Sequence, residues 1–84
     1  MKSIGKVSHY YGKAGVAIVE LQEELKVGDR IRIERAGHSF DQEVTSMQIE
    51  YKPVERAGKG DSVGIKVDEK THEGAQVYVL EETD

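Results

Sequence analysis

The chain of 84 residues contains no cysteine, which excludes disulfide bridges, thiolate metal ligands and a cysteine nucleophile. A domain of this size without cross-links is held together by packing and hydrogen bonds. No apolar run approaches the roughly 20 residues that a membrane helix needs, and the N-terminus lacks the apolar stretch of a signal peptide. We therefore expect a cytoplasmic protein with no membrane association.

Asparagine is also absent, glutamine occurs only four times, and 33% of the residues are charged. Few thermolabile amides together with abundant charge are typical of heat-adapted proteins, which predicts thermostability. Leucine is scarce as well, with three residues against ten valines and six isoleucines. Because β-branched side chains pack well on a pleated sheet and lose freedom in a helix, this ratio favours an all-β domain.

A short sequence pattern occurs three times, in residues 28–33, 60–65 and 74–79. Each copy begins with a glycine and continues into a run in which β-branched residues alternate with other types. Glycine tolerates the positive φ of a tight turn, and the alternation places the branched residues on one face of a strand. Repeated in this way, the pattern predicts a single, small, closed antiparallel β-barrel of six or seven strands over residues 1–80, followed by an acidic tail at 81–84.

The expected strands lie at 3–9, 16–21, 30–34, 40–51, 62–67 and 76–80. The apolar phase of the stretch 40–51 changes, so a bulge or corner is expected near Thr45 and Ser46. Residues 10–15 read as a loop because two glycines flank a lysine. Pro53 marks an edge strand, which leaves a monomer and a weakly paired dimer both open.

The net charge of −4 argues against an indiscriminate nucleic-acid binder, because contacts to phosphates need a cationic surface. The charge is unevenly distributed, however, since residues 1–35 carry a net +2 and residues 36–84 a net −6. The first nineteen residues hold Lys2, Lys6 and Lys13 and no acid. A surface that meets phosphate or acidic groups is therefore expected to involve the N-terminal region.

None of the candidate catalytic motifs has all the residues, or the spacing, that its chemistry requires. His9, His38 and His72 lie about thirty residues apart, without the spacing that places two imidazoles on one metal, and are interpreted as scattered surface residues. No serine sits in a Gly-x-Ser-x-Gly elbow. The pairs Gly12-Lys13 and Gly58-Lys59 lack the adjacent hydroxyl of a phosphate-binding loop. The sequence predicts a protein that is not an enzyme and has no cofactor or metal.

The segment from Ser8 to Lys13 has the most potential for recognition. Adjacent aromatic side chains and a lysine can stack on an unpaired base while the ammonium meets phosphate. Alternatively, one tyrosine caps the core and the other lies on the surface, and the arginines pair with acids on neighbouring strands. The predicted contact residues for RNA or a protein partner are Lys6, His9, Tyr10, Tyr11, Lys13, Arg30 and Arg32.

Several segments of the sequence resemble the β-barrel second domain of translational GTPases such as elongation factor Tu. They are the turn Lys26-Val27-Gly28-Asp29, the strand 44–49, the segment Ala57-Gly58 to Gly64 and the residues 73–77. In that family the domain helps to hold the aminoacylated end of tRNA or contacts the ribosome. The GTPase domain itself has no counterpart here, and the hairpin at 10–16 differs from that of elongation factor Tu.

A second likeness is to the short C-terminal barrel of bacterial collagenase-like peptidases and their RNA-modifying relatives. It rests on His9-Tyr10-Tyr11 and on the segment 46–50. Together the two resemblances imply a non-catalytic, translation elongation factor-like barrel that binds tRNA, the ribosome or another translation-related RNA or protein. The alternative is a structural accessory subunit that supplies in trans the barrel that related enzymes carry.

Overall fold

The computed structural model describes residues 2–80, so the expected acidic tail at 81–84 lies outside the described residues. The described part contains ten strands and no helix, which confirms the all-β prediction. The strands are β1 (Lys2–Tyr11), β2 (Val16–Leu21), β3 (Leu25–Lys26), β4 (Arg30–Arg35), β5 (His38–Glu43), β6 (Met47–Ile49), β7 (Lys52–Val54), β8 (Arg56–Ala57), β9 (Ser62–Lys66) and β10 (Gln76–Val79).

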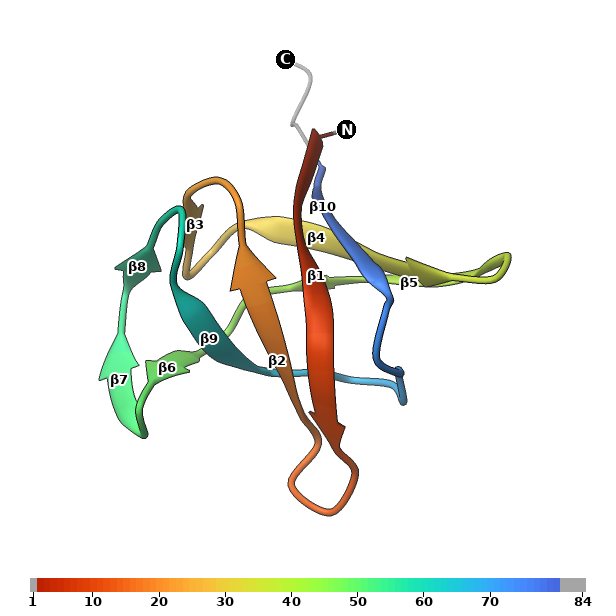
Figure 1. Ribbon diagram of the computed structural model, residues 1–84, viewed down its shortest axis with the longest axis horizontal. Coiled ribbons are helices and arrows are strands. Elements are labelled where there is room, and N and C mark those ends of the chain that lie inside the picture. The colour runs from red at the N-terminus through yellow and green to blue at the C-terminus, as the bar shows by residue number, and fades with distance from the viewer. Residues whose placement is uncertain (1, 81–84) are drawn as a thin grey trace.

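Eight of these strands form one antiparallel sheet in the order β5-β4-β10-β1-β2-β9-β6-β7, and β3 pairs with β8. In Figure 1, β1 and β2 run steeply in front while β4 and β5 cross behind them, so the sheet folds over onto itself. β7, which contains Pro53, lies at one end of the sheet, as expected for a strand with a missing amide donor.

The predicted closed barrel is not confirmed, because no ladder joins the end strands β5 and β7 within residues 2–80. A buried side chain links β5 to the end of β9 instead. The Gln42 amide on β5 donates from Nε2 to the carbonyl of Lys66 at 2.8 Å, and its Oε1 accepts from the Asp68 amide at 2.8 Å. These contacts imitate the two hydrogen bonds of a strand pair, so Gln42 fastens β5 to the end of β9 where no ladder forms.

The core lies between the inward faces of the folded sheet. The alternation in β4 is as predicted, with Ile31 and Ile33 buried and Arg30 exposed. The large side chains with less than 2% exposure are Ile4, Leu25, Ile31, Ile33, Met47, Ile65, Val7, Val19, Val44, Val63 and Val77. β1 approaches β2 closely at Gly5, where an added Cβ would lie 2.5 Å from the carbonyl oxygen of Glu20.

The three repeated glycines all occupy the same kind of turn. Gly28, Gly60 and Gly74 have φ values of 99°, 92° and 89°. In each case the amide of the following residue donates to the carbonyl two positions before the glycine: Asp29 to Lys26, Asp61 to Gly58 and Ala75 to His72. This geometry, with positive φ only at the third position, is that of a type II turn. It confirms that each glycine of the repeated pattern lies in a tight turn with positive φ.

The stretch 40–51 departs from the prediction in one respect. The change of phase is confirmed, because β5 ends at Glu43 and β6 begins at Met47. Glu50 and Tyr51 then form a two-residue turn with φ values of 50° and 67°, between the paired residues Ile49 and Lys52. Tyr51, which the expected strand 40–51 included, lies in this turn instead and is 94% exposed.

Candidate functional site

A bulge in β1 determines which side chains of the N-terminal hairpin face outward. Val7 pairs with Val19 and His9 with Ile18, so Ser8 is an extra residue on the β1 side. Such an insertion reverses the side-chain alternation beyond it. His9 and Tyr11 are consequently exposed, whereas Tyr10 packs against the core. β1 also continues to Tyr11, so the expectation of a loop is wrong for Tyr10 and Tyr11 and holds from Gly12 onward.

The outward side chains of β1 and β2 form an apolar surface, called here the outer patch: His9, Tyr11, Val16 and Ile18. The rings of His9 and Tyr11 stack at a tilt with their centroids 4.3 Å apart, and Tyr11 is 51% exposed. Val16 and Ile18 are half-buried and lie over Gly64 of β9, where an added Cβ would come within 3.3 Å of Val16 and 3.5 Å of Ile18. The missing side chain at Gly64 lets both residues lie flat on the sheet.

The turn beyond the outer patch is fastened to β9. The Lys66 ammonium donates to the carbonyl of Ala14 at 2.9 Å, and the Val67 amide donates to the carbonyl of Gly15 at 2.9 Å. Lys13 is exposed in this turn, and Lys6 is exposed on β1. Of the two tyrosines, Tyr10 packs on the core and Tyr11 lies on the surface.

The two predicted contact arginines stand apart from this hairpin. They lie on β4, and β10 separates β4 from β1 in the sheet. Arg32 forms a bidentate pair with Asp41 of β5, with Nε–Oδ1 at 2.7 Å and Nη2–Oδ2 at 3.0 Å. The hydrogen bond from Arg32 lowers the pKa of the Asp41 carboxyl below its ordinary value. This pairing with an acid on a neighbouring strand is the alternative that the sequence left open for Arg32.

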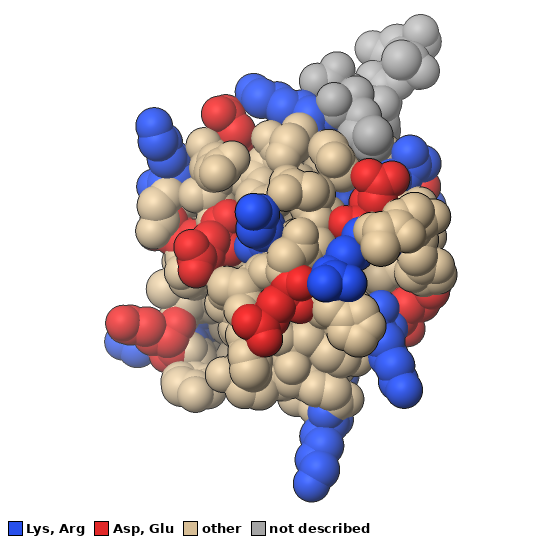
Figure 2. All heavy atoms as spheres, turned by 45° about the vertical axis from the view of Figure 1, so that its right-hand side comes forward, with Lys and Arg blue, Asp and Glu red and all other residues tan. Residues whose placement is uncertain are grey.

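Figure 2 shows basic and acidic side chains interspersed on one face of the molecule, without a continuous basic field on that face. The lower part of this view, at the level of the turn between β1 and β2, consists mainly of uncharged residues. Binding to a phosphate backbone relies on a clustered basic surface. This face therefore lacks the clustered basic surface that such binding needs.

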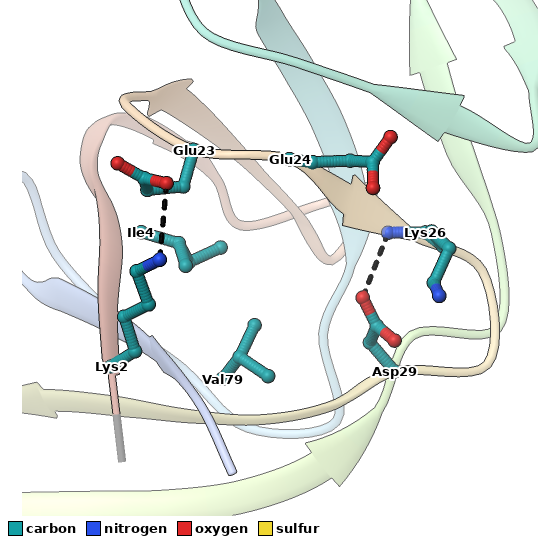
Figure 3. Close-up of a pocket in the computed structure, with 7 residues that line it drawn as sticks. All are labelled: Lys2, Ile4, Glu23, Glu24, Lys26, Asp29 and Val79. Atoms are coloured by element: carbon teal, nitrogen blue, oxygen red, sulfur yellow. Dashed lines mark hydrogen bonds and ion pairs between the residues drawn. The ribbon is translucent and has the colours of Figure 1, made fainter. Parts of the chain in front are cut away.

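A hollow of about 270 Å³ lies beside the N-terminal part of β1, between β3, the turn after it and β10 (Figure 3). In this view, Ile4 and Val79 lie between the Lys2–Glu23 pair on one side and Asp29 on the other. The Lys2 ammonium pairs with Glu23 at 3.2 Å, and the Asp29 carboxylate accepts the amide of Lys26 at 2.9 Å. Because these charged groups have partners within the hollow, they offer little to a ligand.

A second cavity, of about 290 Å³, lies between the β4–β5 hairpin and the loop that precedes β10, and we call it the basic cavity. It is lined by Ile33, Arg35, His38, Phe40, Lys70, Thr71 and His72. Folding thus brings together two of the histidines that were interpreted as scattered. Their separation of 34 positions along the chain carries no pattern that would have revealed the site.

Within residues 2–80, no three His, Cys, Asp or Glu side chains gather as metal ligands. The same residues contain no helix long and apolar enough to cross a membrane.

The chain matches no known family model. It is 44% identical over 81 residues to an uncharacterized protease of Methanocaldococcus jannaschii, which covers 95% of this chain and 20% of that protein. It is 34% identical over 77 residues to a collagenase of Porphyromonas gingivalis, which covers 89% of this chain and 21% of that protein. The chain therefore spans about a fifth of the length of these relatives.

Solved structures identify the fold. The C-terminal domain of a putative U32 peptidase from Geobacillus thermoleovorans superposes with a TM-score of 0.88 at 18% identity, over 95% of this chain and 93% of that chain. Its selenomethionine variant gives a TM-score of 0.86 over 93% and 99%. The chain has the fold of this peptidase C-terminal domain. The predicted likeness to the C-terminal domain of collagenase-like peptidases is confirmed.

The main functional prediction is wrong. The relatives are an uncharacterized protease and a collagenase, and the matching structures are of the C-terminal domain of a putative U32 peptidase. The interpretation as a translation elongation factor-like barrel that binds tRNA is therefore overturned. The error came from the glycine turns. Type II turns before β-branched strands recur in unrelated small β domains, because the same local physics produces them. The alternative, an accessory unit associated with an enzyme, agrees better with these relatives.

Proposed function

We propose that the chain is a non-catalytic accessory module that docks on the catalytic part of a U32-type peptidase. The observation that carries the proposal is its 44% identity, over nearly all of its length, to one fifth of a protease. A segment that accounts for so small a share of an enzyme leaves most of that enzyme to provide the chemistry. The described residues also show no cluster of metal ligands, and the histidines of the basic cavity have no serine or cysteine among the lining residues.

We propose the outer patch as the docking surface. Exposed aromatic residues, with tyrosine prominent among them, frequently dominate the energy of protein interfaces. Tyr11 is half-exposed and is held by His9 on one side, so little side-chain freedom is lost when a partner covers it. The flat arrangement of Val16 and Ile18 over Gly64 extends the apolar area next to it.

The border of the outer patch indicates the charge of the partner. Lys6 and Lys13 are exposed on the same hairpin, where Lys6 lies opposite the exposed Glu20 and Lys13 lies in the turn, with no acid between residues 2 and 19. Charge complementarity at the rim of an interface directs encounter and orientation more than it adds affinity. We therefore propose a partner surface with an apolar centre and carboxylates around it, on the catalytic part of the peptidase.

Binding to a relative tests the proposal directly. The Methanocaldococcus jannaschii protease, lacking the 81-residue segment that matches this chain, is the partner in a calorimetric titration. Circular dichroism first establishes that the truncated protease is folded. We expect saturable 1:1 binding, and a Tyr11→Ser variant that binds about tenfold more weakly or worse, since tyrosine anchors typically contribute more than 1 kcal/mol.

Tyr51→Ser is the matched control. Tyr51 is 94% exposed on the turn between β6 and β7, away from β1 and β2 in the sheet order, so we expect unchanged binding. Equal losses in the two variants would contradict the choice of surface. Absence of binding by the unmodified chain, or hydrolysis of peptides by the chain alone, would contradict the proposed role.

A further inference from the structure

The basic cavity has an unusual charge for this protein. Two of its seven lining residues, Arg35 and Lys70, are cationic, two more are histidines and none is acidic, whereas the chain as a whole carries a net −4 with its histidines counted as neutral. Its volume of about 290 Å³ lies near the lower end of small-molecule sites, which range from roughly 300 to 1,000 Å³. The cavity therefore suits a small anion.

The hydrogen-bonding groups of these basic residues are only partly used. Arg35 donates from Nε to the carbonyl of Glu73 at 3.0 Å, which orients the guanidinium, while its two terminal nitrogens make no hydrogen bond within residues 2–80. In the same part of the chain, Lys70 and His72 form no side-chain hydrogen bond or ion pair. His38 has the Glu69 carboxylate 3.9 Å from its Nε2, which is a long contact between two exposed groups.

Thr71 provides an independent indication of a ligand site. The residue is only 5% exposed, yet its hydroxyl makes no hydrogen bond to the described residues. No side-chain oxygen or nitrogen among these residues is both fully buried and unpartnered, so the Thr71 hydroxyl retains contact with solvent. Thr71 also lines the cavity. A nearly buried polar group that opens into a cavity is what a ligand's hydrogen-bonding atom requires.

The floor of the cavity is apolar. Ile33 is 2% exposed and Phe40 is 7% exposed, and both line it. An inorganic anion gains nothing from such a surface, whereas a ligand with an apolar body buries area against it. An arginine fork beside a lysine recognises a planar carboxylate well, because two parallel hydrogen bonds match its two oxygens.

We infer that the basic cavity is a binding site for a small organic carboxylate, in which one carboxylate group is attached to a compact apolar body. The carboxylate lies among Arg35, Lys70 and the Thr71 hydroxyl, and the apolar body rests on Ile33 and Phe40. The cavity shares no residue with the outer patch, so this inference does not depend on the docking proposal.

The test is a two-dimensional NMR titration of the full chain with N-acetyl-L-leucine as the probe. We expect saturable shifts of the amides around residues 33–40 and 70–72. N-acetyl-L-leucinamide has the same body without the charge, and inorganic phosphate has the charge without the body. The amide should bind at least about tenfold more weakly, since a charge-assisted hydrogen bond contributes at least that factor. Phosphate should also bind more weakly, because it has no apolar body to bury against Ile33 and Phe40. Equal shifts with the amide, equal or tighter binding of phosphate, or no saturable shift with N-acetyl-L-leucine would overturn the inference.

Variants locate the site independently of the probe. Lys70→Gln removes an exposed charge from the cavity rim, and Thr71→Val removes the hydroxyl while keeping the shape of the side chain. We expect each to weaken N-acetyl-L-leucine binding, by about tenfold for the lysine. Lys59→Gln changes the net charge equally at an exposed turn outside the cavity and should leave binding unchanged. If Lys59→Gln weakens the binding of N-acetyl-L-leucine as much as Lys70→Gln does, the effect is one of general charge and the assigned site is wrong.

Discussion

Replacing Gln42 by methionine tests whether one side chain fastens β5 to β9. Gln42 is only 4% exposed, and its amide meets the carbonyl of Lys66 and the amide of Asp68, each at 2.8 Å. Methionine preserves the length and most of the volume of the side chain but cannot replace either hydrogen bond. The variant therefore isolates the two bonds from the packing around them.

The expected cost follows mainly from the Lys66 carbonyl and the Asp68 amide, which lose a short hydrogen bond each; the bond from Gln42 Nε2 to the carbonyl of the neighbouring Glu43 is longer, at 3.3 Å. A buried polar group without a hydrogen bond costs about 1–3 kcal/mol. Lys66 and Asp68 are exposed residues, so water reaches part of their backbone after the change, and the lower end of the range applies to each. The sum is about 2 kcal/mol. For a domain of this size 1 kcal/mol shifts the melting temperature by roughly 4–8 °C, which gives a decrease of roughly 8–16 °C.

Urea unfolding followed by circular dichroism measures this change, and Gln48→Met is the control. Gln48 is exposed on β6 and makes no side-chain hydrogen bond within residues 2–80, so its replacement should alter the free energy of unfolding by less than about 0.5 kcal/mol. If Gln42→Met and Gln48→Met have equal stabilities, the Gln42 bridge is not what holds β5 in place.

Three further changes test local features of the fold. Gly5→Ala should destabilise the chain by about 1–3 kcal/mol in thermal unfolding, because its Cβ would lie 2.5 Å from a backbone oxygen, whereas Gly58→Ala, with nothing within 4 Å, should not. Ala36→Asn should raise the melting temperature by a few degrees, because Ala36 has a φ of 52° in the two-residue β4–β5 turn, a conformation that asparagine tolerates better. The pKa of Asp41, followed by NMR, should lie below its ordinary value and rise in Arg32→Gln. Because the folded-state pKa is the lower one, the contribution of this exposed pair is present above the unfolded-state pKa and is lost as the pH falls through the folded-state pKa.

The strands that the sequence predicted well are those whose signals are local. A glycine that needs positive φ, followed by alternating branched residues, defines both a turn and the face of the next strand. The starts of β4, β9 and β10 were predicted correctly for this reason. Gly5 inside the predicted strand 3–9 carries a local signal too, because a glycine within a strand often marks a close approach of another backbone, as is found here with β2.

The turn at Glu50 and Tyr51 could not be predicted in the same way. Neither residue favours positive φ, and both are found there because the register of β6 with β7 closes the hairpin at this point. Tertiary pairing overrides local preference here, and an interpretation based on preference extended the strand by two residues. Tyr51 was therefore included in the strand, whereas it lies in the turn with its side chain exposed.

The outer patch shows the same limit at the level of function. The aromatic segment was recognised from its composition, but which tyrosine faces outward depends on the bulge at Ser8, and a bulge of this kind leaves no mark in the residue pattern. One extra residue exchanges the orientations of Tyr10 and Tyr11 and creates the stacked pair His9–Tyr11. A deletion of Ser8 should reverse this exchange, so the orientation of the outer patch depends on a single residue.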